Sequence, residues 1–188
     1  MNLGFKGSAP ELSGKLGDDA LRIAQGLIRT GRKRIGLLAC PSDLDVEPVA
    51  IAVGGALSAL CEGSVVIADL SARFRSGPAP ASENTAERGS VILGRWLSRS
   101  LAVLAPRDRL KQAGWLAALR CMLESAARSE LVLVDLAGLP RVDALRAVEL
   151  IDGTCVIGRA GRTREKELIG LYRELLPSKD LGVILTDW

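Results

Sequence analysis

The sequence predicts an α/β protein whose sheet is doubly wound, mainly parallel and flanked by helices. Short apolar runs alternate along the 188 residues with helical patterns, which is typical of βαβ units. Several of these runs are apolar at every position, as expected for parallel strands that are covered on both faces. Aromatic residues make up only 3% of the chain, so Leu, Val, Ile and Ala must build the core, which suits a sheet between helices.

The chain length favours one domain, which we place at residues 18–188. Residues 1–17 are rich in Gly, Ser and Pro, and we interpret them as a flexible arm. Asp18 or Asp19 is expected to cap a helix that continues to about Arg29. The apolar face of this helix is predicted to consist of Leu21, Ala24, Leu27 and Ile28.

The next elements carry the strand and helix patterns of a βαβ unit. We expect a strand over residues 35–40, a helix over 49–60 and a second apolar strand over 64–69. Gly54 and Gly55 would let the helix pack closely. Residues 75–90 are rich in Gly, Pro and polar residues and are interpreted as a mobile loop. A short helix containing Trp96 is expected over residues 91–100.

The second half of the chain continues the alternation of strands and helices. The expected strands cover residues 101–105, 131–135, 154–159 and 181–186. The expected helices cover residues 110–128, 141–150 and 163–175. In the first of these helices, the buried face is predicted to carry Leu116, Leu119 and Leu123 beside Trp115 or Met122. Trp188 is the preferred candidate for an interface anchor.

Composition excludes several classes of function. Histidine is absent, which removes Ser-His-Asp, Cys-His and His-metal chemistry. The net charge is only +3 and the basic residues are scattered, so nucleic-acid binding is not predicted. The four cysteines form no CxxC pair and are interpreted as buried reduced thiols. No signal sequence and no apolar run of roughly 20 residues is present, so we expect a cytoplasmic protein without direct membrane insertion.

The loop at residues 41–48 has the position of a phosphate-binding loop but not its chemistry. Such a loop would be rich in glycine and would end in Lys followed by Ser or Thr. Here it has no glycine and no base, and it carries the acids Asp43, Asp45 and Glu47. Their alternating spacing is compatible with a hard cation, but a solvated acidic loop is more common, and no metal site is predicted.

Three segments together resemble the MinD/ParA-type P-loop ATPases, and specifically the bacterial tyrosine kinases of capsule and exopolysaccharide synthesis. Residues 49–57 are similar to the helix that follows the family's Walker A loop, and residues 65–73 resemble its second acidic motif. Residues 131–188 resemble its C-terminal half, which begins with a Walker B strand ending at Asp135. In an active relative, the residue at the position of Asp69 would help to activate the attacking group, and the residue at the position of Asp135 would bind magnesium.

The departures from this family are as informative as the similarities. The resemblance places Val46 at the Walker A lysine, Glu47 at its Ser/Thr, and Ser71 at the second Asp of the acidic motif. The family's C-terminal tyrosine cluster is missing, and Tyr172 is the only tyrosine. We therefore predict no catalytic residue, no ATP or magnesium binding, and only a vestigial nucleotide site formed by Ser42, Asp43, Asp45, Val46, Glu47, Asp69, Ser71 and Asp135.

The resemblance implies a catalytically inactive relative of these kinases that regulates or scaffolds exopolysaccharide assembly. The expected partner is a protein: a membrane chain-length protein, through which the chain would associate with the membrane, an active kinase paralogue, or a second copy of the chain. One alternative is a divergent nucleotide-dependent ATPase or kinase that uses Asp69 and Asp135. A ParA-like positioning protein is the other alternative.

Overall fold

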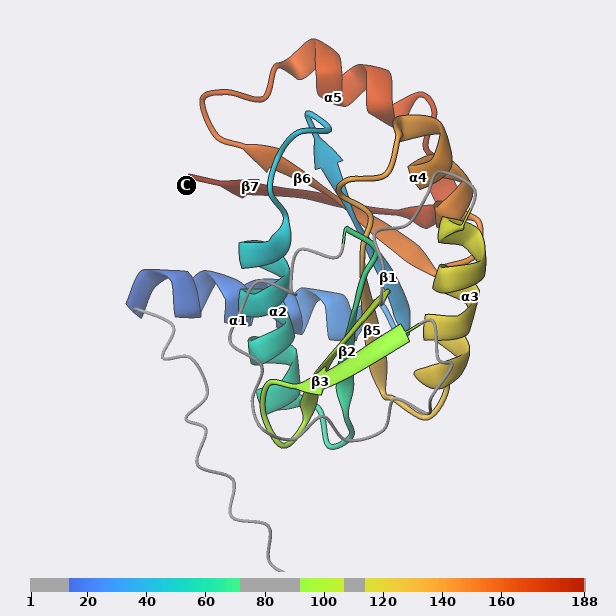
Figure 1. Cartoon of the computed structure of the whole chain (residues 1–188). Coiled ribbons are helices and arrows are strands. Elements are labelled where there is room, and N and C mark those ends of the chain that lie inside the picture. The colour runs from blue at the N-terminus through green and yellow to red at the C-terminus, as the bar shows by residue number, and fades with distance from the viewer. Residues whose placement is uncertain (1–13, 72–91, 107–113, 188) are drawn as a thin grey trace, which may run out of the picture.

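The computed structural model describes residues 14–71, 92–106 and 114–187, which form a seven-stranded sheet with helices on both faces (Figure 1). The strands are β1 (Arg34–Cys40), β2 (Val65–Asp69), β3 (Ile92–Trp96), β4 (Leu101–Pro106), β5 (Leu131–Asp135), β6 (Gly153–Arg159) and β7 (Asp180–Thr186). The helices are α1 (Gly14–Arg29), α2 (Glu47–Leu60), α3 (Trp115–Ser125), α4 (Arg141–Val148), α5 (Glu165–Tyr172) and the short 3₁₀ helix η2 (Pro177–Lys179).

The strand order is β3-β4-β2-β5-β1-β6-β7. Every neighbouring pair is parallel except β3 and β4, which are antiparallel. This confirms the predicted α/β fold with a mainly parallel sheet. It also explains why most strands are apolar throughout, because helices cover both sides of the central strands.

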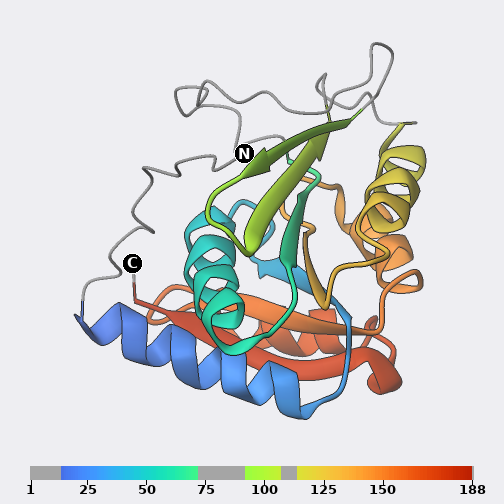
Figure 2. The same cartoon turned by 90° about the horizontal axis from the view of Figure 1, so that it is seen from below.

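Two apolar clusters lie on the two faces of the sheet. Helices α1 and α2 cover one cluster, and α3, α4 and α5 cover the other (Figures 1 and 2). Successive residues of β1 alternate between them, so Leu37 belongs to the first cluster and Leu38 to the second. Gly54 lets α2 lie close to the sheet, since a Cβ atom there would come within 3.0 Å of Ile67 Cδ1.

The helix predicted over residues 91–100 is wrong, because β3 occupies its first half. β3 pairs with β4 in a hairpin closed by residues 97–100, where Leu97 N–H donates to the Leu101 carbonyl at 2.8 Å. Ser98 Oγ accepts a hydrogen bond from Leu101 N–H at 3.1 Å. The long-range ladder with β4 therefore overrides the local helix propensity of Leu, Arg and Trp.

Helix α1 differs from the prediction in its start and in its buried face. It begins at Gly14, before the expected cap at Asp18 or Asp19. Its buried side chains include Ala20, Ala24 and Leu27. Leu21 and Ile28 are exposed, so their assignment to the buried face is wrong. Since α1 packs against α2, small alanine side chains allow the close approach that the apolar pattern alone did not indicate.

Helix α3 buries the predicted face with the exception of Leu116. Trp115, Leu119, Met122 and Leu123 are buried, whereas Leu116 is exposed and was wrongly placed in the core. The expected loop at 75–90 and Trp188 lie outside the described residues, as do residues 1–13 of the expected arm. Among the described residues, no helix has the length and apolar character needed to cross a membrane.

Candidate functional site

The carboxyl ends of β1, β2 and β5 meet at one edge of the sheet, where doubly wound folds bind their ligands. Asp69 and Asp135 are the last residues of neighbouring strands and lie opposite each other in register. Both are fully buried. The structure therefore brings together the two carboxylates that the sequence predicted at this edge.

Both carboxylates bind the loops that follow their own strands. Asp135 Oδ1 accepts a hydrogen bond from Ala137 N–H at 2.8 Å, and Asp69 Oδ1 accepts one from Ser71 Oγ at 2.5 Å. Gly138 has a φ of 86° and lies against Ser71. A Cβ atom added at position 138 would lie 3.3 Å from the Cβ atom of Ser71. These contacts join the two loops, which is the loop-capping role open to a carboxylate at a strand end.

The loop between β1 and α2 turns the side chain of Val46 inward. Leu44 N–H donates to the Pro41 carbonyl at 3.1 Å, which closes a turn that leaves Ser42 and Asp43 exposed. Val46 is 0% exposed and belongs to the apolar cluster under α1 and α2. Its side chain therefore fills the core and does not line the ligand edge.

The N-terminus of α2 already faces carboxylates of the chain itself. Asp45 Oδ1 accepts a hydrogen bond from Glu47 N–H at 3.2 Å, and Pro48 in the first turn has no N–H to donate. Glu47 lies in the same turn. A helix N-terminus attracts anions through its free N–H groups and its dipole, and here the carboxylate of Asp45 accepts one of these N–H groups.

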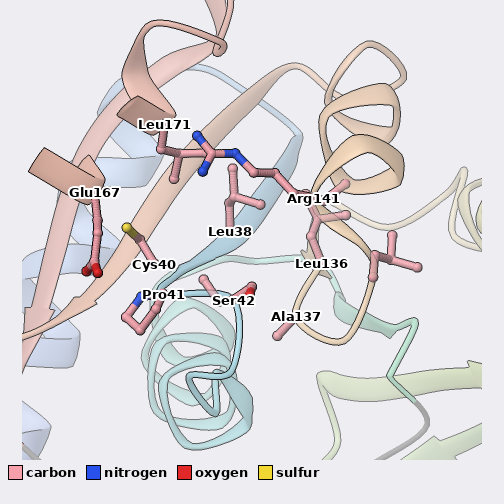
Figure 3. Close-up of a pocket in the computed structure, with 12 residues that line it drawn as sticks. Leu38, Cys40, Pro41, Ser42, Leu136, Ala137, Arg141, Glu167 and Leu171 are labelled. Atoms are coloured by element: carbon pink, nitrogen blue, oxygen red, sulfur yellow. The ribbon is translucent and has the colours of Figure 1, made fainter. Parts of the chain in front are cut away.

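A pocket of about 180 Å³ lies beneath α4 and α5, on the side of β1 opposite to the apolar cluster that contains Val46 (Figure 3). Figure 3 shows Arg141 and Glu167 on opposite sides of Leu38 and Cys40. Arg141 forms a bidentate ion pair with Glu174, at 2.9 and 3.0 Å. The lining residues are Leu38, Ala39, Cys40, Pro41, Ser42, Leu136, Ala137, Leu139, Arg141, Ala144, Glu167 and Leu171.

Hydrogen bonds link the elements around the pocket, and the surroundings of Cys40 shift its pKa. Thr163 Oγ1 donates to the Cys40 carbonyl at 2.8 Å and accepts from Arg159 N–H at 2.7 Å, which ties the β6–α5 turn to the end of β1. Burial, and then the charge of Glu167, raises the pKa of the Cys40 thiol, although Arg141 lowers it. Cys40 therefore stays protonated, which makes it a weak nucleophile.

The other cysteines and the single tyrosine show the same trend where they are buried. Burial raises the pKa of Cys155 to about 12. Burial and then the neighbouring Asp180 raise the pKa of Tyr172 to about 12. Cys121 is exposed, so the interpretation of all the cysteines as buried thiols is wrong for this residue, which lies on α3.

Several residues of this edge were missed from the sequence. Thr163 lies in the C-terminal segment that carries the resemblance, and Arg141 and Glu167 lie in expected helices, but no pattern in the sequence connected them with β1. Among the described residues, no group of three or more His, Cys, Asp or Glu side chains has the arrangement of a metal site, so Asp43, Asp45 and Glu47 are not gathered around a common centre.

Comparison with solved structures shows that the chain has the fold of bacterial tyrosine kinase domains. The VpsO kinase domain matches with a TM-score of 0.65 and 14% identity, over 92% of this chain and 94% of that one. The chimerical protein CapA2B2 matches with a TM-score of 0.66 and 13% identity, over 94% and 86%. The kinase domain of the Escherichia coli tyrosine kinase ETK matches with a TM-score of 0.57 and 17% identity, over 89% and 74%. No protein-family model and no curated protein matches the sequence.

Proposed function

We propose that this chain is a catalytically inactive relative of the polysaccharide-synthesis tyrosine kinases, and that it acts as a regulatory or scaffolding protein. One observation carries the proposal. Val46, at the position that the resemblance gives to the phosphate-binding lysine, is completely buried in the core. The chain then has no cation at that position to stabilise the charge of a transferring phosphoryl group.

The charges at the loop support the same proposal. Asp43 and Asp45 are exposed, and Glu47 lies in the first turn of α2. A carboxylate about 4 Å from one phosphate charge would cost about 4 kcal/mol at an effective dielectric constant near 20. A loop with three acids thus repels a triphosphate that a glycine-rich loop would bind.

A second candidate function is a divergent nucleotide-dependent enzyme. The observation that favours it is the pair Asp69 and Asp135, which lie side by side and buried at the ligand edge of the sheet. Such a pair could hold a magnesium ion that carries a nucleotide. In that case Asp135→Asn would abolish Mg-ATP binding, whereas the inactive relative would show no binding to lose.

The test is calorimetric titration with Mg-ATP and Mg-ADP, together with thermal melting. A ligand present at about 100 times its Kd stabilises a fold by about 2.7 kcal/mol, which is a clear shift in Tm. The ETK kinase domain serves as the matched positive control with the same fold. We expect no heat and no shift for this chain up to millimolar nucleotide. Micromolar binding that Asp135→Asn removes would reject the inactive relative in favour of the second candidate.

If the chain binds no nucleotide, binding to a protein is the activity that we propose for it. The candidates are a membrane chain-length protein, an active kinase paralogue and a second copy of this chain. Calorimetry against an active kinase domain, with and without Mg-ATP, tests the paralogue directly. A regulator is expected to bind it and change its rate of autophosphorylation, and an unchanged rate at saturating concentration would contradict a regulatory role toward that kinase.

A further inference from the structure

The pocket beneath α4 and α5 lies where the connections of two neighbouring strands leave the sheet on opposite faces. β1 and β5 are adjacent, and the chain passes from β1 to α2 over one apolar cluster and from β5 to α4 over the other. Open α/β sheets bind ligands in the crevice at such a point. Both connections contribute to the lining, with Pro41, Ser42, Leu136, Ala137 and Leu139. Helix α2 packs on the opposite face, so the pocket is separate from its N-terminus.

The walls of the pocket are apolar, and its volume suits a small molecule. An apolar cavity of about 150 Å³ already holds benzene. The volume of about 180 Å³ in this chain is slightly larger, so the pocket admits a chain or ring of about six carbon atoms. Leu38, Leu136, Ala144 and Leu171 are buried in its walls. Because pockets for drug-sized ligands begin at about 300 Å³, we expect a ligand with a short apolar body.

Two charged side chains line the pocket, and only one of them is neutralised by an ion pair. Arg141 binds both carboxylate oxygens of Glu174, at 2.9 and 3.0 Å. The Oε2 atom of Glu167 accepts a hydrogen bond from Arg164 N–H at 3.1 Å, which orients the carboxylate at the start of α5. Within the part of the chain that the structure describes, Glu167 forms no ion pair. The lining therefore carries one negative charge that the chain does not compensate.

The charge of Glu167 dominates inside the pocket, as the Cys40 thiol shows. After burial, Glu167 is the largest cause that raises the pKa of Cys40, and the opposite effect of Arg141 is smaller. Figure 3 shows the Glu167 carboxylate and the Cys40 thiol on the same side of the pocket. Arg162 and Arg164 precede α5, are exposed and do not line the pocket, so solvent screens their charges. The pocket therefore favours a cation over an anion.

We propose that this pocket binds a primary ammonium group carried on a short aliphatic chain. The ammonium pairs with the Glu167 carboxylate, and the carbon chain packs between Leu38 and Leu171. A hydrogen bond between two charged groups is stronger than one between neutral groups, and the apolar walls account for the rest of the ligand. Two sources offer this chemistry, which are a free alkylamine and the side chain of a lysine in a partner protein.

This inference does not depend on the loss of catalysis. Nucleotide titration tests the inactive relative, and amine titration tests the pocket, so either proposal can fail alone. If the source is a lysine of a protein, the pocket also gives the proposed protein partner a place to bind.

The experiment is a titration of the full chain with pentylamine at constant ionic strength, followed through the amide signals in ¹H–¹⁵N NMR spectra. A ligand of about six heavy atoms is expected to bind with a Kd in the millimolar range. The signals of Leu38, Cys40 and Leu171 should shift, because these residues line the pocket. Pentanol should bind at least about tenfold more weakly, and pentanoate should not bind, because neither can pair with a carboxylate as a cation does. No shift at these residues, or equal affinity for amine and alcohol, would overturn the inference.

A pair of variants on the first turn of α5 tests the role of the carboxylate. Glu167→Gln removes the charge and keeps an acceptor for the Arg164 N–H, since glutamine also serves in a capping box. It should weaken pentylamine binding at least about tenfold. Glu165→Gln is the matched control, because Glu165 is exposed on the same turn and does not line the pocket. Equal affinities in the two variants would contradict the assignment of Glu167.

N-acetyl-lysine methylamide distinguishes the two sources of the ammonium group. Binding of this blocked lysine at least as tight as that of pentylamine supports the proposal with a partner's lysine as the occupant. Binding of pentylamine alone supports it with a free amine, since the peptide groups would then clash at the mouth of the pocket. Failure of both probes to shift the lining signals would overturn it.

Discussion

Introducing a lysine at position 46 is the most direct test of the proposal that this loop forms no phosphate site. Val46 is completely buried, so Val46→Lys removes about 1.5 to 2 kcal/mol of apolar burial. The ordinary pKa of a lysine lies about 3 units above pH 7, and each unit corresponds to about 1.4 kcal/mol. Removing the proton so that the side chain can be buried without charge at pH 7 therefore costs about 4 kcal/mol in addition. Because the long side chain can partly reach solvent, we expect a loss of about 3 to 6 kcal/mol in the free energy of unfolding.

The loss should shrink as the pH rises from 7 to 10. Burial lowers the pKa of the new lysine in the folded state, so the unfolded state binds more protons in this range. The free energy of unfolding therefore increases with pH relative to the unmodified chain. A merely steric defect at Val46 would give a penalty that does not change with pH.

Urea unfolding at both pH values measures these differences, and two variants separate their causes. Val46→Ala isolates the loss of packing, at about 1 to 3 kcal/mol. Asp43→Lys places the same charge on an exposed residue of the loop and should change stability by no more than about 0.5 kcal/mol. The reasoning is refuted if Val46→Lys is as stable as the unmodified chain and binds Mg-ATP at micromolar concentration, because residue 46 would then face an open phosphate site.

Two further predictions concern the core. Gly36→Ala should destabilise the fold by about 1 to 3 kcal/mol in urea, since its Cβ would lie 2.5 Å from the buried Ile151 Cδ1, whereas Gly26→Ala, with no atom within 4 Å, should not. Stability should also fall as the pH rises above about 9, because the pKa values of Cys155 and Tyr172 are raised to about 12 in the folded state and the unfolded state releases these protons first. Melting curves from pH 8 to 11 should show this loss reduced in Cys155→Ala, and an identical pH profile for both proteins would contradict it.

The parts of the fold that could be predicted are those in which local pattern and final environment agree. The apolar runs of β1, β2 and β5 are covered on both faces, so their composition alone indicates buried parallel strands. β3 could not be predicted, because Trp96 and its neighbours form a strand only through the ladder with β4. Likewise Leu21 and Leu116 fit apolar helical stripes, and only the packing of α1 and α3 showed that these positions face outward.

The candidate site divides in the same way. The loop acids Asp43 and Asp45 are visible in the sequence, and they are the reason why no phosphate site was predicted there. Arg141 and Thr163 reach the pocket region from other segments of the chain, so no spacing in the sequence connects them with Cys40.

The amino-acid sequence by itself determined the α/β class, the order of most strands and helices, and the acidic loop at residues 41–48. Only the tertiary structure decided that Val46 points into the core, that Asp69 and Asp135 bind their own loops, and that β7 is an outer strand with exposed Val183 and Leu185. The physical reason is that periodicity and composition report the local preference of a segment. The direction of one side chain, and the neighbour that a strand lacks, depend on contacts between segments that are distant in the sequence.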